Sequence, residues 1–122
     1  MNIEEVIQHC LSYPETEETV PFGPDALVYK VCGKMFALTA PDQFPSRVNL
    51  KCDPDEAMEL RDQYEAVIPG YHMNKKHWNT VTLDGSIPSA LISKMIDNSY
   101  RLVVQSLKKA DRERILSLFE AE

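Results

Sequence analysis

Two lysines, two of the three histidines and the only tryptophan lie within eight residues, from Tyr71 to Trp78. Ammonium groups pair with phosphates, while imidazole and amide groups add hydrogen bonds. The segment also lies in a window without acids, from Ala66 to Leu83, although the chain has a net charge of −6. These residue types predict either a surface for an anionic partner or a hairpin organised around a buried tryptophan.

The negative charge is concentrated at the beginning of the chain. Six of the 19 acids and none of the 13 lysines and arginines lie in the first 25 residues. The remaining 97 residues therefore carry 13 acids and 13 bases. A locally basic surface is compatible with this distribution, so the overall charge does not exclude nucleic acid as a partner.

Length and composition predict one soluble domain spanning residues 1–122. The chain is 43% hydrophobic and 26% charged, which is ordinary for a globular protein. No apolar run approaches the ~18 residues of a membrane span, and the first residues do not resemble a signal peptide, so we expect a cytoplasmic location. The three cysteines, Cys10, Cys32 and Cys52, are far apart in the sequence and predict reduced thiols packed as small hydrophobic residues.

Periodicity and turn residues predict the order of the elements. Residues 2–12 and 88–108 repeat apolar side chains at three- and four-residue steps, as amphipathic helices do. Asp53 followed by Pro54, with Glu56 three residues after Asp53, predicts the start of another helix. Strands are expected at Ala26–Val31, Lys34–Thr39, Arg47–Cys52, Val67–His72 and Trp78–Leu83. The acidic stretch Glu15–Glu18 is expected to lead into a turn. A short last helix is expected at Asp111–Phe119. This order predicts an α+β fold with helices packed on one face of a mostly antiparallel sheet.

The spacing of the candidate ligands and nucleophiles argues against a metal centre or an enzyme. His72 and His77 are five residues apart across an expected turn and have no obvious third ligand. The chain has neither a G-x-S-x-G elbow nor a P-loop, so we predict no catalytic residues, no metal and no cofactor. Acid–base catalysis by His72 or His77 with Asp84 is a weaker alternative. Loose binding of a hard cation by the acidic N-terminal segment is another, although such a run is more often a solvated face.

The lysine pair at the expected turn has neighbours that suit a single use. Lys75 and Lys76 can meet phosphates, and Asn74, His72 and His77 can add polar contacts. Two lysines neutralise few phosphates, so Arg47, Lys51, Arg101, Lys108 and Lys109 would strengthen this surface only if the fold brings them near. A lone tryptophan is more often buried than exposed. With Trp78 pointing inward, its strand neighbours His77 and Asn79 would point outward.

The chain resembles the MmcQ/YjbR family of small bacterial proteins. The matching run extends from Pro69 to Val81 and contains a His-x-Asn-Lys-x-His-Trp core, and further similarity covers nearly the whole chain, including Leu60-Arg61. The resemblance implies a CyaY-like (frataxin-like) α/β sandwich. It also implies DNA binding through what has been called a double-wing arrangement.

These observations lead to two hypotheses about function. The first is a non-enzymatic DNA-binding protein that uses a polar and basic surface at His72, Asn74, Lys75, Lys76, His77 and Asn79, with Trp78 and Tyr71 as structural support. The second is a binding module that uses the same window for a small anionic ligand or a protein partner. A metabolite screen by thermal shift would separate them, because a ligand that binds only the folded state raises the melting temperature.

Overall fold

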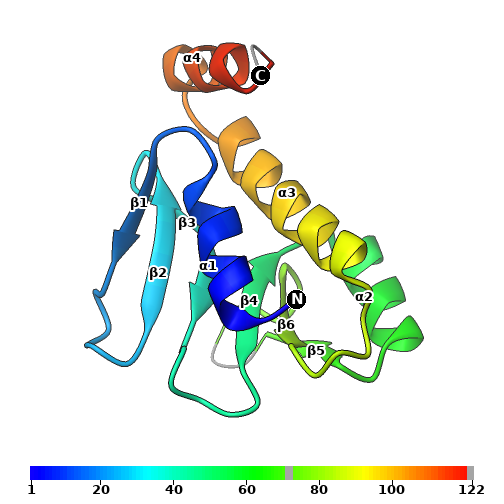
Figure 1. Ribbon diagram of the computed structural model, residues 1–122. Coiled ribbons are helices and arrows are strands. Elements are labelled where there is room, and N and C mark those ends of the chain that lie inside the picture. Colours follow the sequence, from blue (N-terminus) through cyan, green and yellow to red (C-terminus); the bar gives the residue numbers. More distant parts are fainter. Residues whose placement is uncertain (71–72, 121–122) are drawn as a thin grey trace.

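Six strands of the described chain form one antiparallel sheet, and four helices accompany it (Figure 1). The computed structural model describes residues 1–70 and 73–120. The elements are α1 (Ile3–Leu11), β1 (Thr16–Thr19), β2 (Leu27–Val31), β3 (Lys34–Thr39), β4 (Arg47–Lys51), α2 (Pro54–Gln63), β5 (Val67–Pro69), β6 (Trp78–Thr82), α3 (Ser89–Gln105) and α4 (Lys109–Glu120). The predicted α+β class is therefore confirmed, and no described helix is long and apolar enough to cross a membrane.

The strands lie in the order β1-β2-β3-β4-β6-β5, so only the last two exchange places relative to the sequence. β4 lies next to β6, with Arg47 opposite Thr82 and Lys51 opposite Trp78. The predicted β2–β3 hairpin is confirmed, and its two loop residues both have positive φ angles, +49° at Cys32 and +79° at Gly33. This conformation matches the twist of the strands that the loop joins.

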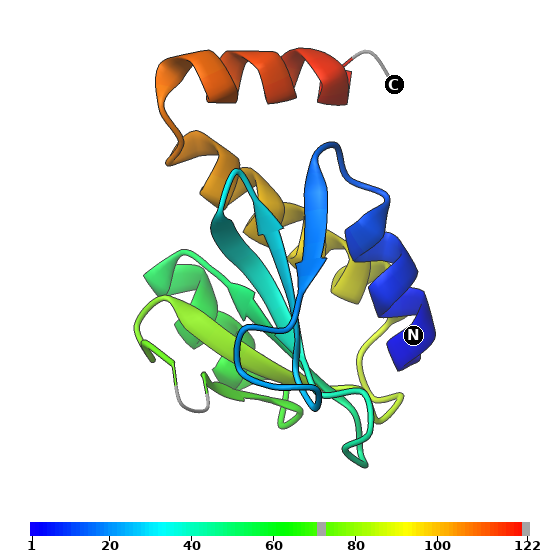
Figure 2. The same cartoon turned by 90° about the vertical axis from the view of Figure 1, so that its left-hand side faces the viewer.

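Helices α1, α2 and α3 pack on one face of the sheet, as expected, whereas α4 lies beyond its end (Figure 1). α1 and α3 lie side by side over the strands, while α2 lies beside β5 and α4 packs against the end of α3 (Figures 1 and 2). The predicted apolar face of α3 is buried, including Ile96 and Val103, and meets Val48 and Leu50 of β4 in the core. The predicted cap at Asp53 is confirmed, because its side chain accepts from the amides of Asp55 and Glu56 at the start of α2. Asn2 caps α1 in the same way by accepting from the amide of Glu5, which was not predicted.

One buried hydroxyl joins α3 to two strands. Ser99 Oγ donates to the carbonyl oxygen of Phe36 at 2.6 Å and accepts from the amide of Lys51 at 2.9 Å. Ser99 is fully buried, so neither backbone group could replace this partner with water without opening the core. The contact fixes α3 relative to β3 and β4.

Strand β1 was not predicted. The acidic residues Glu17 and Glu18 lie within it, and it pairs only with β2 at the edge of the sheet. A four-residue edge strand has no apolar alternation, so its sequence carries no periodic signal. Tyr29 Oη donates to Glu18 at 2.8 Å, which gives this strand a side-chain contact as well as its ladder.

The cysteines are free, but the prediction that all three are packed in the interior is wrong for one of them. Cys10 and Cys52 are buried, whereas Cys32 is exposed in the hairpin loop. Burial raises the pKa of Cys10 to about 12 and that of Cys52 to about 11. The pKa of Cys32 is also raised, chiefly because neighbouring atoms partly desolvate its thiol.

One fast-reacting thiol is therefore expected when the folded protein meets Ellman's reagent near neutral pH. Cys32 should react first, because the reagent reaches it and the other two thiols are both shielded and protonated. All three should react after denaturation. A Cys32→Ser variant should lose the fast phase, and two fast thiols in the native protein would contradict the burial of Cys10 and Cys52.

Candidate functional site

The site predicted from the sequence lies mainly in the connection between β5 and β6. Tyr71 and His72 fall outside the described residues. Of the other predicted residues, Asn74, Lys75 and Lys76 are exposed, and His77 is half-buried. The structure therefore brings the two lysines to the surface together, in one turn.

Asn74 organises this turn. Its Oδ1 accepts from the amide of Lys76 at 2.9 Å. Its carbonyl oxygen accepts from the amides of His77 at 3.3 Å and Trp78 at 3.0 Å. The side-chain oxygen of Asn74 is thus used to shape the backbone around Lys75 and Lys76, as in other Asx turns.

The base of the connection is closed by a close approach between Gly70 and Trp78. The amide of Gly70 donates to the carbonyl oxygen of Trp78 at 2.8 Å. A Cβ atom on Gly70 would lie 2.8 Å from Cβ of Trp78, closer than real Cβ atoms come. Glycine is therefore required here by the contact between the two backbones.

Arg61 of α2 holds the end of the turn. Its Nε donates to Oδ1 of Asn79 at 2.7 Å, and its terminal nitrogen donates to the carbonyl oxygens of Lys75 and of Trp78, the latter at 3.4 Å. The sequence reasoning did not assign Arg61 any such role, because an arginine on the polar side of an expected helix gives no signal of its own. Arg61 stood out in the sequence only because the Leu60-Arg61 pair is part of the family resemblance.

The predicted orientation of β6 is wrong. Asn79 is only 3% exposed and points to the helices, where its Nδ2 donates to the carbonyl oxygen of Ala57 at 3.3 Å. Val81 lies in the same core, so the alternation of the strand places Trp78 and Thr80 on the opposite face. Trp78 is half-buried there. Hydrogen bonds to α2 favour this orientation, because Arg61 and the carbonyl oxygen of Ala57 are partners for the buried side-chain amide of Asn79 on the core side.

The face of the sheet opposite the helices, here called the open face, carries two of the additional bases. Val48 and Leu50 of β4 enter the core, so Arg47, Asn49 and Lys51 face the other way. No ion pair of the described residues involves Arg47, Lys51, Lys75 or Lys76. The ion pairs among the described residues use Arg101, Lys108, Lys109 and Arg114, all on α3 or at α4.

The other three basic residues that the sequence offered for this surface lie away from the open face. Arg101 is on α3, and Lys108 and Lys109 are at the start of α4, which projects beyond the sheet at the end of α3 (Figure 1). Arg101 pairs with Asp97 at 2.8 Å, so its charge is already partnered. These three residues do not extend the surface formed by Lys75 and Lys76.

The acidic N-terminal segment has partners within the protein. Glu15 accepts from Nε and a terminal nitrogen of Arg114 at 2.8 and 2.9 Å, and these hydrogen bonds lower the pKa of its carboxyl group. Glu18 accepts from Tyr29. No group of three or more histidine, cysteine or acidic side chains among residues 1–70 and 73–120 is placed to hold a metal ion.

A cavity of about 340 Å³ opens on the open face. Phe22 from the β1–β2 connection, Leu38 and Ala40 from β3 and the residue just after it, and Met73 from the β5–β6 connection give it apolar walls. Phe22 is 71% exposed even though it lines the cavity. Sequence reasoning missed this site, since its residues come from connections that only the folded sheet brings together.

Polar groups occupy one side of the cavity. Thr80 Oγ1 donates to Asn49 Oδ1, and Asn49 Nδ2 donates to the carbonyl oxygen of Leu38 at 3.3 Å. Arg47 and Gln43 complete this side. Nε of Arg47 is buried and has no hydrogen-bond acceptor among the described residues, so the protein leaves a cationic donor unsatisfied beside a hollow.

Comparison with known proteins identifies related chains. The family model described as YjbR matches residues 11–102. The chain is 40% identical over 106 residues to YbdF of Escherichia coli O157:H7, with 87% of each chain covered. It is 36% identical over 118 residues to YjbR of Escherichia coli strain K12, covering 97% of this chain and 100% of that one. Both relatives are described as uncharacterized proteins.

Two solved structures have the same fold. A Deinococcus radiodurans protein with the DUF419 domain, DR2400, gives a TM-score of 0.87 at 41% identity, covering 93% of this chain and 87% of that one. A Pseudomonas syringae protein gives a TM-score of 0.73 at 28% identity, covering 84% of this chain and 98% of that one. The similarity therefore extends through the sheet and the helices that pack on it.

Proposed function

Since the chain belongs to the YjbR family, we propose that it is a non-enzymatic DNA-binding protein whose binding surface is the turn at residues 73–77 and the adjacent open face. The observation that carries this proposal is that four basic side chains lie in this turn and on the adjacent open face, Arg47 and Lys51 on β4 and Lys75 and Lys76 in the turn, and that none of the four makes an ion pair with another described residue. Free cationic groups at the surface are available to phosphates.

The two lysines are proposed to contact phosphates. Their turn is held by Asn74 and Arg61, so the ammonium groups are presented from a fixed backbone. His77 and Asn74 are proposed to add polar contacts from the same turn, and His72, which lies outside the described residues, keeps the polar contact predicted for it from the sequence. Asn79 is buried and bonded to α2, so it supports the surface from within.

Alanine at both Lys75 and Lys76 is expected to weaken duplex DNA binding and to reduce its salt dependence. Each phosphate contact contributes about 0.9 to the slope of log K against log salt, so the slope should fall by about 2. Fluorescence anisotropy across a range of salt concentrations measures both quantities. Both lysines are exposed, so folding should be unaffected.

Lys108 and Lys109, changed together to alanine, provide the matched control. This pair has the same charge and the same spacing but lies at the start of α4. Removing these two lysines should leave DNA affinity nearly unchanged, apart from the small effect of lowering the total positive charge of the protein by two. Equal effects of the two double variants, or no binding by the unaltered protein at low salt, would refute the proposed surface.

The cavity favours a second candidate function, a binding module for a small anionic ligand. The observation that supports it is that Arg47 lines the cavity of about 340 Å³ and makes no ion pair with another described residue. A rise in melting temperature with one of a panel of small anions, without measurable DNA binding, would select this alternative. The absence of any shift across the panel would count against it.

A further inference from the structure

We propose that the cavity on the open face binds a single nucleobase, carried either by a free nucleotide or by an unpaired position of a DNA strand. Both sources present the same ring chemistry with a phosphate attached. The strand-bound form rests on the proposed function, whereas the free-nucleotide form stands without it.

The dimensions and walls of the cavity suit one ring system. Its volume of about 340 Å³ is at the small end of the ~300–1,000 Å³ typical of ligand pockets. Leu38 and Met73 provide apolar surface for the faces of a planar ring, and the ring of Phe22 can stack on it. A bound base would also cover Phe22, which is otherwise exposed to water.

The polar side of the cavity suits the edge of a base, which carries both donors and acceptors. Arg47 lines this side of the cavity, and its guanidinium makes no ion pair with another described residue. Asn49 Nδ2 has a second N–H, because only one is used toward Leu38. The Arg47 guanidinium and the second N–H of Asn49 could donate to a base carbonyl or ring nitrogen, whereas a lipid tail offers no acceptor.

Basic side chains lie where the phosphate of such a ligand would need them. Lys75 follows Met73 by two residues, so their Cα atoms are at most about 7 Å apart. Lys51 follows Asn49 by two residues on the same face of β4, again about 7 Å along the strand. A base in the cavity would therefore place its phosphate within reach of lysine side chains.

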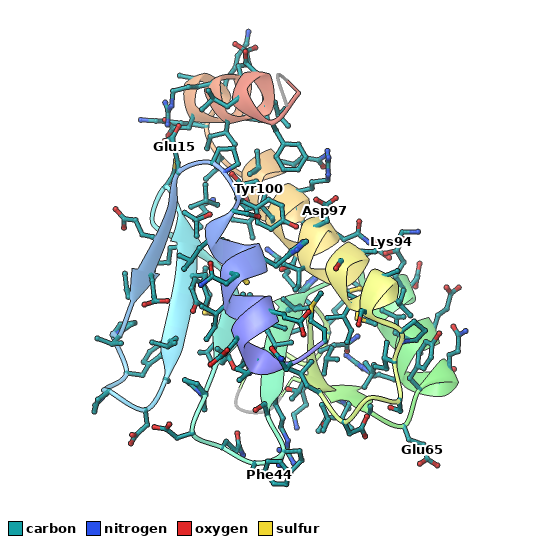
Figure 3. All side chains as sticks on the ribbon, in the orientation of Figure 1. Glu15, Phe44, Glu65, Lys94, Asp97 and Tyr100 are labelled. Atoms are coloured by element: carbon teal, nitrogen blue, oxygen red, sulfur yellow. The ribbon has the colours of Figure 1, made fainter. Side chains whose placement is uncertain are left out.

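An exposed aromatic residue, Phe44, extends the surface beyond the cavity. Phe44 is 95% exposed in the β3–β4 connection, next to the cavity residue Gln43, and it projects from that loop at the end of the molecule (Figure 3). Aromatic rings beside a basic groove are the usual platform for unstacked bases. In the strand-bound form, Phe44 would stack on the base next to the one in the cavity.

The test compares three probes with the whole protein. They are the four deoxynucleoside monophosphates, a single strand of about ten nucleotides, and a strand of the same length whose sugars carry no bases. Calorimetry gives the affinities, and amide NMR shifts show whether the cavity residues Leu38, Asn49 and Thr80 respond. Binding of a monophosphate at these residues supports the free-nucleotide source, and tighter binding of the strand than of its base-free counterpart supports the strand source.

Two variants separate the cavity from the lysines. Phe22→Ala is expected to weaken base binding roughly fivefold to a hundredfold, the usual effect of losing one stacked ring. Arg47→Gln is expected to weaken it at least about tenfold, through the loss of a charged donor. Met58→Ala, at an exposed hydrophobic residue of α2 that does not line the cavity, is the matched control and should bind as the unaltered protein does.

The outcomes distinguish this inference from the proposed function. If the strand and its base-free counterpart bind equally, only the lysine variant weakens them, and no monophosphate binds in the cavity, the DNA-binding surface stands and the nucleobase site is refuted. If monophosphates bind in the cavity and DNA does not bind, the proposed function is refuted and the nucleobase site stands. If no probe shifts the cavity residues, or if Phe22→Ala and Arg47→Gln bind normally, the inference is overturned.

Discussion

Replacing Arg61 with alanine is expected to lower the free energy of unfolding by about 2–4 kcal/mol, because a charged donor is lost from several acceptors at once. The guanidinium bonds Asn79 Oδ1 and the carbonyl oxygens of Lys75 and Trp78. The Asn79 oxygen is buried and would have no ready substitute. Denaturant unfolding followed by circular dichroism measures this change.

A control and a conservative variant make this result specific. Arg112→Ala removes an arginine from α4 whose side chain makes no hydrogen bond or ion pair with another described residue, so its effect should be below about 0.5 kcal/mol. Arg61→Lys keeps the charge but cannot reproduce the planar fork, so it should recover only part of the loss. Equal stability of Arg61→Ala and Arg112→Ala would show that Arg61 does not hold the turn.

The same substitution has an expected effect on binding. Without Arg61 the turn at residues 73–77 loses its attachment to α2, so Lys75 and Lys76 must be ordered when DNA binds. Affinity should fall although neither lysine has changed, while the number of phosphate contacts, and therefore the salt slope, should stay nearly constant. This pattern differs from that of the lysine variants, which reduce both.

Replacing Ser99 with alanine is expected to destabilise the fold by about 2–4 kcal/mol. The substitution leaves the amide of Lys51 and the carbonyl oxygen of Phe36 without their partner in the interior. Hydrogen exchange should therefore accelerate at the Lys51 amide more than at its neighbours. Thermal and denaturant unfolding give the total loss.

Ser93 provides the matched position on the same helix. Its hydroxyl makes no hydrogen bond with another residue in the described part of the chain, so Ser93→Ala should be nearly neutral, or slightly stabilising through helix propensity. Unchanged stability and unchanged Lys51 exchange in Ser99→Ala would contradict the role assigned to this hydroxyl.

Most of the secondary structure followed from the sequence because its signals are local. The cap at Asp53, the apolar stripe of α3 and the short loop at Cys32-Gly33 each depend on residues near one another in the chain. The strand predicted at Lys34–Thr39 has these bounds in the structure, whereas the other four predicted strands were longer than those found; for example, the strand expected to continue to residue 72 ends at Pro69. β1 was missed because its sequence lacks the alternation of apolar residues that marks a strand, and only its pairing with β2 holds it in the sheet.

The site was harder to predict because it depends on contacts between distant segments. The exposed lysine pair was correctly anticipated, since charged residues in a turn seldom become buried. The orientation of Trp78 and Asn79 was not, because hydrophobicity favours an inward tryptophan while Arg61 and Ala57 provide partners for an inward amide. The cavity is lined by residues from three connections and from strands β3, β4 and β6, and the spacing of these residues in the sequence does not indicate that they lie close together in the fold.

The two outer strands have a consequence for self-association. An unpaired strand edge invites another copy of the chain to add to the sheet, which is a common route to aggregation. On one side, β1 is four residues long and presents Glu17 and Glu18 in the acidic N-terminal segment, so two such edges would repel each other. On the other side, β5 is three residues long and ends in Pro69, which has no N–H to offer an incoming strand. Both outer strands therefore protect the sheet against open-ended growth while its open face stays accessible.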